Sequence, residues 1–203
     1  MGFYQRQVQP RMLDVFMGTK TLDEIRARVC VGLTGDVLEI GHGSGRNLRH
    51  LPREVTGVWA VEPSTVGLRL SMKRRSTSAP PVVIGGDDAQ SLPFPDDRFD
   101  AALSTWTLCG IPDAGTALSE IARVLKPGAV LHFVEHGLSP DAKVARWQRR
   151  GNRLNTIVAG CVLDKDIVSL MDASGLTVTA LDTYYEKGAP KASGHLFEGR
   201  AVA

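Results

Sequence analysis

The sequence contains few cysteines, no long apolar run and almost no excess of charge. Its three cysteines, Cys30, Cys109 and Cys161, lie far apart and form no C-x-x-C pair. This number and spacing argue against a disulfide framework and a structural zinc site, and they fit a reducing compartment. No apolar run approaches the length that spans a bilayer, and the first residues include no signal-like apolar region. We therefore expect a soluble, cytoplasmic protein without a bound metal.

Charge is nearly balanced, since 24 lysines and arginines face 22 aspartates and glutamates, a formal net charge of +2. Such a balance creates no general attraction to nucleic acid, so no nucleic-acid partner is expected. Basic residues do gather locally beside Trp147, at a spacing that places them on one helical face. These residues are Arg146, Arg149, Arg150 and Arg153. The cluster fits either a solvated helix face or peripheral contact with a membrane surface or an anionic acceptor.

Short apolar runs alternate with amphipathic segments, a pattern typical of an α/β domain with a mainly parallel sheet. Strands are predicted at residues 37–40, 55–61, 81–84, 99–104, 130–134, 176–183 and 194–202. Helices are predicted in two pieces between 11 and 31, between the glycines at 41–45 and Pro52, and at 63–75, 114–125, 140–154 and 164–173. We expect one domain over residues 1–203, with a doubly wound, seven-stranded sheet and helices on both faces. Residues 1–34 are expected to form a lid over the ligand site, and the chain to be a monomer or a homodimer.

A glycine-rich turn, Gly41-His42-Gly43-Ser44-Gly45, follows the first predicted strand. Glycine accepts positive φ angles and leaves room for a ligand to approach the backbone. A nicotinamide dinucleotide would require glycine where Arg46 stands, and Glu39 at the strand end would repel phosphate. Glu62, at the tip of the second strand, is placed to accept hydrogen bonds from both hydroxyls of a ribose, although an acid at a helix N-terminus has the same appearance. The turn therefore favours a cationic ligand without phosphate.

Four segments together resemble the class I S-adenosylmethionine-dependent methyltransferases of the group often called type 11. Residues 37–45, VLEIGHGSG, resemble the first family motif, with His42 where Cys, Ser or Ala is more usual, and residues 61–64, VEPS, are similar to the second. Residues 86–94 resemble the segment that holds adenine, and residues 99–104 and 121–128 resemble the fourth strand and the helix after it. The resemblance implies a Rossmann-like fold, S-adenosylmethionine as cofactor with S-adenosylhomocysteine as product, and a small-molecule methyl acceptor.

The same resemblance assigns the cofactor site residue by residue. It implies that the methionine amino group lies near Glu39, Gly41 and Ser104, and that Glu62 takes the ribose hydroxyls. It also implies that adenine meets the Asp88 carboxylate and the Ala89 amide, with Asp88 preferred to Asp87 because Ala89 follows it. The expected cofactor-binding residues are Glu39, Gly41, His42, Gly43, Gly45, Asn47, Glu62, Pro63, Asp88, Ala89, Ser104 and Thr105.

A narrower resemblance concerns the methyl acceptor. Residues 106–110, 133–137 and 160–161 look like a subgroup that includes small-thiol S-methyltransferases. A thiol or another small, partly apolar acceptor is therefore expected. The alternatives are a lipid head group, a phenol, an amine, or a cofactor-binding module without catalysis.

Several side chains are candidates for the acceptor site. Methyl transfer from a sulfonium depends mainly on positioning in a dry pocket, and a dedicated base is not always needed. His136, after the fifth strand, is the first candidate base; His42 and His195 are weaker, and a histidine bonded to backbone at the rim is the alternative interpretation. Trp106, Cys109 and Tyr185 are candidates for the acceptor pocket, as is Tyr184, with core packing as the alternative.

Overall fold

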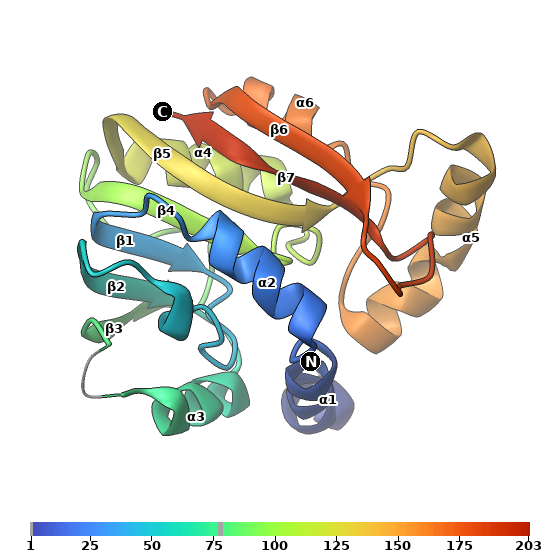
Figure 1. Cartoon of the computed structure of the whole chain (residues 1–203), viewed down its shortest axis with the longest axis horizontal. Helices are drawn as coiled ribbons and strands as arrows, with labels where there is room; N and C mark the ends of the chain where they lie inside the picture. The colour runs from blue at the N-terminus through green and yellow to red at the C-terminus, as the bar shows by residue number, and fades with distance from the viewer. Residues whose placement is uncertain (1, 77–78) are drawn as a thin grey trace.

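The computed structural model describes residues 2–76 and 79–203, and its centre is one seven-stranded sheet (Figure 1). The strands are β1 (Gly35–Ile40), β2 (Val55–Val61), β3 (Val82–Gly86), β4 (Phe99–Thr105), β5 (Leu125–His136), β6 (Thr177–Tyr185) and β7 (His195–Val202). They lie in the order β3-β2-β1-β4-β5-β7-β6. The first five pair in parallel, and β7 runs antiparallel to both β5 and β6. The predicted seven-stranded, mainly parallel sheet is confirmed.

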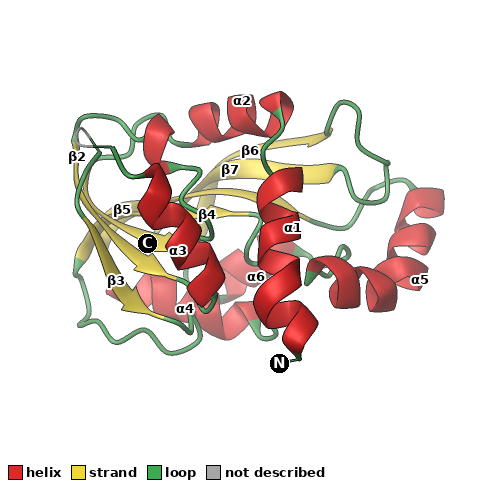
Figure 2. Cartoon of the chain, turned by 90° about the horizontal axis from the view of Figure 1, so that it is seen from below, coloured by secondary structure: helices red, strands yellow, loops and turns green. Residues whose placement is uncertain are grey.

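Helices cover both faces of this sheet (Figure 2). They are η1 (Tyr4–Val8), α1 (Gln9–Phe16), α2 (Lys20–Val29), η2 (Leu48–His50), α3 (Thr65–Arg74), α4 (Ala114–Val124), α5 (Ala142–Ala159) and α6 (Ile167–Ala173). The buried side chains form two main clusters, one with α2 and the other with α4 and α6. Val37 belongs to the first cluster and its neighbour Leu38 to the second, because successive side chains of a strand point to opposite faces.

Two predicted elements differ from the structure. The helix expected between Gly45 and Pro52 is wrong, since only the short 3-10 helix η2 forms there. Proline disfavours the helical conformation of the residue before it, and Leu51 is extended with φ −66° and ψ 132°. Strand β5 begins at Leu125 rather than Val130, because Leu125 already pairs with Phe99 before the register shifts.

The two predicted N-terminal helices are present, and they lie in different places. Helix α2 packs on the sheet through Leu22, Ile25 and Val29, so it is part of the core. Helix α1 buries no side chain and lies between α3 and α5 (Figures 1 and 2). None of the helices in the described residues is long and apolar enough to cross a membrane.

Candidate active site

The candidate site lies where β1, β2, β4 and β5 end. The chain continues from β1 to β2 on one side and returns to β4 on the other, so the sheet order reverses at β1. In open α/β sheets, ligands bind outside the carboxyl ends of the strands at this switch point. The glycine turn, Glu62 and the segment after β4 follow these strand ends, and His136 is the last residue of β5.

The glycine turn needs its three glycines for two different reasons. Gly41, Gly43 and Gly45 have φ angles of 72°, 54° and 74°, which side chains other than glycine rarely adopt. A Cβ at Gly41 would collide with the side chain of Thr107, and one at Gly45 with Ser71. A Cβ at Gly43 would meet no atom closer than the Gly41 carbonyl at 3.8 Å. The turn is therefore tightly packed at both ends and open at Gly43, where a ligand would reach the backbone.

Glu39 is buried next to the turn, and each of its carboxylate oxygens has a partner within the protein. Its Oε2 lies 2.5 Å from His42 Nδ1, and its Oε1 accepts a hydrogen bond from Asn47 Nδ2 at 2.6 Å. His42 Nε2 lies 2.6 Å from Ser71 Oγ, which ties the turn to α3. Burial lowers the pKa of His42, but the Glu39 carboxylate outweighs it and the pKa is raised. Glu39 and His42 therefore hold the shape of the turn.

Asn47 contributes an acceptor that has no partner among the described residues. Its amide nitrogen also donates to Thr105 Oγ1 at 3.0 Å, and its Oδ1 is buried without a hydrogen bond. A buried polar atom of this kind costs free energy unless a ligand or water satisfies it. An acceptor beside the Glu39 carboxylate suits a cationic amino group.

Glu62 is held over the same turn by backbone groups. Gly43 N–H donates to its Oε2 at 2.6 Å, and Ser64 N–H donates to its Oε1 at 2.7 Å. Burial raises the pKa of Glu62, although these two hydrogen bonds act in the opposite direction. Each oxygen keeps a second lone pair, so the carboxylate is oriented and still able to accept from two hydroxyls.

The predicted adenine segment lies after β3. Asp88 is exposed, and its Oδ1 accepts from Gln90 N and Nε2 at 2.9 and 3.1 Å. Ala89 is buried beside it, while Pro63 is exposed at the start of α3. Asp88 is thus oriented by Gln90 through Oδ1, and among the described residues Oδ2 accepts no hydrogen bond.

Glu135, which the sequence interpretation missed, organises the segment after β4. It is buried, and its Oε1 accepts from Ser104 Oγ at 2.8 Å and from Thr107 N at 2.9 Å. Its Oε2 accepts from Cys109 N at 3.2 Å. The Ser104 hydroxyl is therefore engaged inside the protein. An acid at the end of the apolar run 130–134 was the signal that could have identified Glu135.

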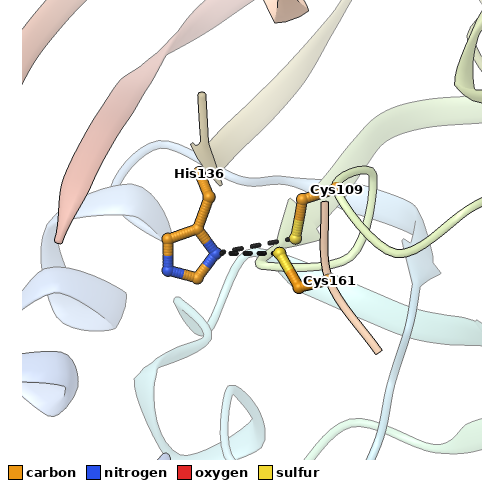
Figure 3. A group of neighbouring side chains, drawn as sticks. All are labelled: Cys109, His136 and Cys161. Atoms are coloured by element: carbon orange, nitrogen blue, oxygen red, sulfur yellow. Dashed lines mark hydrogen bonds between the residues drawn. The ribbon is translucent and has the colours of Figure 1, made fainter. Parts of the chain in front are cut away.

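His136 lies against two cysteines that are distant in sequence (Figure 3). Its Nδ1 is 3.6 Å from Cys109 Sγ and 3.4 Å from Cys161 Sγ. Both thiols are buried, whereas His136 is only partly buried. Burial lowers the pKa of His136, but contact with Cys109 and the charge of Glu135 raise it overall. The wide sequence spacing had argued against any metal-ligating cysteine cluster.

The other predicted acceptor residues lie in different surroundings. Trp106 has an unusual φ of 52° and packs with the α2 cluster, 4.7 Å beneath the Arg26 guanidinium. Tyr185 forms a hydrogen bond of 2.6 Å with Ser139, and its ring lies 5.0 Å from that of His195.

The remaining two candidates also have partners within the protein. Tyr184 contacts Arg28 and Glu198, and His195 Nδ1 lies 3.4 Å from the Gly137 carbonyl. Of the predicted acceptor residues, Cys109 is the one in contact with His136.

Helix α1 is fastened to the glycine turn by Asp14. The Asp14 carboxylate accepts from Ser44 Oγ at 2.5 Å, from Arg46 Nε at 3.1 Å and from Arg74 Nη2 at 2.9 Å. The other end of the segment reaches α5, because Tyr4 Oη and Gln9 Nε2 both donate to the Val158 carbonyl at 3.1 Å. The segment from η1 to α1 therefore joins the glycine turn to α5.

Comparisons with known proteins agree with this geometry. Residues 38–133 match the family described as "Methyltransferase domain". The fatty-acid O-methyltransferase of Mycolicibacterium smegmatis is 33% identical over 118 residues, which cover 56% of this chain and 40% of that protein. The 2-phytyl-1,4-naphtoquinone methyltransferase of Synechococcus elongatus is 40% identical over 99 residues, 46% of this chain and 42% of that protein. The matched segments thus span less than half the length of these curated relatives.

Solved structures share the fold over nearly the whole chain. An S-adenosylmethionine-dependent methyltransferase from Thermotoga maritima is 21% identical, with a TM-score of 0.66 over 95% of this chain and 93% of that one. The cyclase SpnF is 19% identical, with a TM-score of 0.67 over 89% of this chain and 79% of that one. At these identities the likeness shows the fold alone.

Proposed function

We propose that this chain, whose residues 38–133 match the methyltransferase domain family, is a class I S-adenosylmethionine-dependent methyltransferase that transfers the methyl group of S-adenosylmethionine to a small, partly apolar acceptor, preferably a thiol. The observation that carries this proposal is the glycine turn, which is open at Gly43 beside Glu62 and which lies near a buried acceptor, Asn47 Oδ1, that has no partner among the described residues. This set of groups matches a cationic ligand that carries a ribose and no phosphate.

The residues present fit the cofactor at three places. Asn47 Oδ1 would accept from the amino group of its methionine part, with Glu39 keeping the surroundings negative. Glu62 would accept from the ribose hydroxyls, and Asp88 with the Ala89 amide would hold adenine. When bound, the cofactor supplies an electrophilic methyl group on a positively charged sulfur.

The protein's contribution to the transfer is to position the acceptor and exclude water. We assign residues 2–17 as the lid, because Asp14 fastens this segment over the turn and Gln9 joins it to α5. His136 is the proposed base: its Nδ1 faces the two thiols, so Nε2 is the atom left to accept a proton from the acceptor (Figure 3). A thiol is preferred because its proton is the easiest of the candidate acceptors' protons to remove near neutral pH.

The exposed surface of helix α5 supports binding of this enzyme to a membrane surface. Its four clustered arginines are exposed, and so are Trp147, Leu154 and Ile157, at 67%, 68% and 56%. Exposed apolar side chains among arginines favour an anionic lipid surface, from which a partly apolar acceptor could be taken. Sedimentation with anionic vesicles tests this: Trp147→Ser should weaken binding, and vesicles of neutral lipid should bind less.

Calorimetric titration with S-adenosylmethionine tests the cofactor site. Glu62→Ala and Asp88→Ala should each weaken binding by about tenfold or more, because each loses hydrogen bonds to the ligand. Asp182→Ala, which removes an exposed acid on β6, is the matched control and should bind like the wild type. Equal affinity in Glu62→Ala and wild type would show that the assignment is wrong.

Incubation of the cofactor complex with thiols, phenols, amines and lipid head groups tests the acceptor. The proposal expects a product of the thiol heavier by one methylene. If only phenols, amines or lipid head groups give a methylated product, the class that reacts replaces the thiol as the proposed acceptor. Tight cofactor binding with no product from any class would favour a cofactor-binding module without catalysis.

A further inference from the structure

We propose that Cys109, His136 and Cys161 form a zinc site whose fourth position binds the acceptor as a thiolate. The three ligand atoms, two Sγ and one Nδ1, lie within 4.8 Å of one another (Figure 3). The metal site stands on this geometry alone, while the role in activating the acceptor rests on the proposed methyl transfer.

The spacing of the ligand atoms matches a zinc centre before any metal is added. Zinc lies about 2.3 Å from thiolate sulfur and about 2.0 Å from imidazole nitrogen, so tetrahedral ligands of these two kinds are about 3.5 Å apart. The observed separations between sulfur and nitrogen are 3.6 and 3.4 Å. Two thiolates and one imidazole are a donor set that zinc prefers, and three protein ligands are the number that leaves a position open for chemistry.

The backbone holds the two cysteine loops together. Val162 N–H donates to the Cys109 carbonyl at 3.0 Å, so the residue after Cys161 is bonded to the other cysteine. A Cβ at Gly110 would lie 2.9 Å from the Gly160 carbonyl oxygen, so only glycine allows this close approach. Asn155 Nδ2 also donates to the Cys161 carbonyl, at 2.6 Å. The thiols therefore converge because of fixed main-chain contacts.

Neighbouring side chains form hydrogen bonds to the backbone that carries the proposed ligands. Glu135 accepts from Cys109 N–H at 3.2 Å, and Lys165 Nζ donates to the Leu108 carbonyl at 3.0 Å. The three residues Cys109, Cys161 and Leu163 form a small buried cluster apart from the two main clusters of the core. Partners that fix the ligands in this way are typical of metal centres.

The open side of the cluster and its neighbours suit a thiol acceptor. Both cysteines are buried and His136 is partly exposed, so access is on the histidine side. Two residues before Cys109, the Thr107 side chain touches Gly41 of the cofactor turn. The segment from Thr107 to Cys109 thus links the cofactor turn to the cluster.

The chemistry balances without any further reactant. The acceptor thiol loses its proton to solvent as its sulfur binds zinc, so this step no longer requires His136 as a base. The acceptor sulfur then forms a bond to the methyl carbon, and the bond from that carbon to the sulfonium sulfur breaks with its electron pair returning to that sulfur. The methylated product is a neutral thioether, a weaker zinc ligand than a thiolate, and it dissociates.

Metal analysis of the full chain tests the site independently of activity. After treatment with a chelator and reloading with zinc, the wild type should retain about one zinc per chain. Cobalt should give the visible absorption of a tetrahedral centre and a sulfur-to-cobalt charge-transfer band. Cys109→Ser, Cys161→Ser and His136→Gln should lose the zinc and change the cobalt spectrum. Cys30→Ala removes a buried thiol outside the cluster, and this variant should keep both the bound zinc and the wild-type cobalt spectrum.

Two results would overturn the zinc site. In the first, the wild type retains no more zinc than the Cys109→Ser, Cys161→Ser double variant. In the second, the isolated protein contains a disulfide between these two cysteines. Calorimetry with S-adenosylmethionine should give wild-type affinity for all variants, which shows that they are folded. If the wild type itself does not bind S-adenosylmethionine, the proposed function is contradicted, but the result of the metal analysis still holds.

The acceptor role has its own readout. Chelation should lower turnover of a thiol by about 100-fold, and zinc should restore it. A thiol should also shift the cobalt spectrum when it is added without S-adenosylmethionine. Turnover that is unchanged by chelation, or a cobalt spectrum unmoved by the thiol, would remove the activating role.

Discussion

His42 stands in the glycine turn where the resemblance to the family motif leads us to expect Cys, Ser or Ala, and the structure gives it a structural role. Its ring joins the buried Glu39 to Ser71 on α3. A small residue at this position could not form that connection. The turn is therefore held by a side-chain relay in addition to the backbone geometry of its glycines.

This relay predicts a pH dependence of stability. Glu39 and Glu62 raise the pKa of His42 above its ordinary value of 6.5, against the effects of burial and of Arg75. A group whose pKa is raised by folding stabilises the protein fully below its unfolded pKa, and this contribution is lost as the pH rises through the folded pKa. Urea unfolding of wild type and His42→Gln should therefore differ most below the ordinary histidine pKa of 6.5, and the difference should shrink as the pH rises above it. Parallel stability curves for the two proteins would contradict the prediction.

Single residues also mark where sequence interpretation succeeded and where it could not. The position of Glu62 beside the turn could be predicted because it directly follows β2, the neighbour of the strand that leads into the glycine turn, so topology alone brings them together. Cys109 and Cys161 come from separate loops, and their meeting depends on the contacts of Gly110 and Val162. Local spacing contains no record of such contacts, which is why the cysteines were interpreted as unrelated.

Among the elements, helix α1 is held in place by a small number of polar contacts, and these contacts can be tested one at a time. It buries no side chain of its own, so its position depends on Asp14 at one end of the segment and on Tyr4 and Gln9 at the other. Burial raises the pKa of Asp14, but its hydrogen bonds to Ser44 and Arg74 and the charge of Arg46 lower it overall. The carboxylate is thus charged and bonded to the turn at neutral pH.

Asp14→Asn should loosen the lid without unfolding the domain. The neutral amide cannot replace the charged contacts to Arg46 and Arg74, so amide exchange in residues 4–16 should become about tenfold faster while exchange in α2 stays unchanged. Hydrogen exchange followed by mass spectrometry measures this. Asp23→Asn is the matched control, because it also neutralises an ion-paired aspartate, but one that lies on α2 and pairs with Arg49 and His50. Similar exchange in α1 of both variants would show that Asp14 does not fasten the lid.

Element boundaries followed the sequence where local signals were strong. Ser64 accepts a hydrogen bond from Gly67 N–H and begins α3, and Asp113 does the same for α4, as side chains at a helix N-terminus are expected to do. The sequence predicted a helix that ends at residue 125 and a strand that begins at residue 130, so the segment 125–128 was not expected to be part of a strand. It joins β5 through pairing with β4, a tertiary contact that overrides the local pattern.

At the scale of the whole molecule, the alternation of apolar runs was sufficient to predict the sheet, because the runs that form β1, β2 and β4 are largely buried, whereas the edge strands β3 and β6 contain no buried residue. The same regularity does not determine the acceptor. The proposed cofactor site uses the turn and strand ends that a family motif describes, whereas the proposed acceptor side adds α1, α5 and the loop at Cys161. These parts meet through a few hydrogen bonds, such as that from Gln9 to Val158.

Cofactor binding should stabilise the folded chain as a unit, since the proposed cofactor site joins residues at or after the ends of β1, β2, β3 and β4. A ligand at about 100 times its dissociation constant adds about 2.7 kcal/mol to the free energy of unfolding. For a domain of about 200 residues this raises the melting temperature by about 5–10 °C. S-adenosylmethionine should produce this shift in the wild type and a much smaller one in Glu62→Ala, and NAD should produce none because Arg46 stands where its turn needs glycine. A shift with NAD and none with S-adenosylmethionine would contradict the cofactor assignment, whereas a full shift in Glu62→Ala would contradict only the role of that carboxylate.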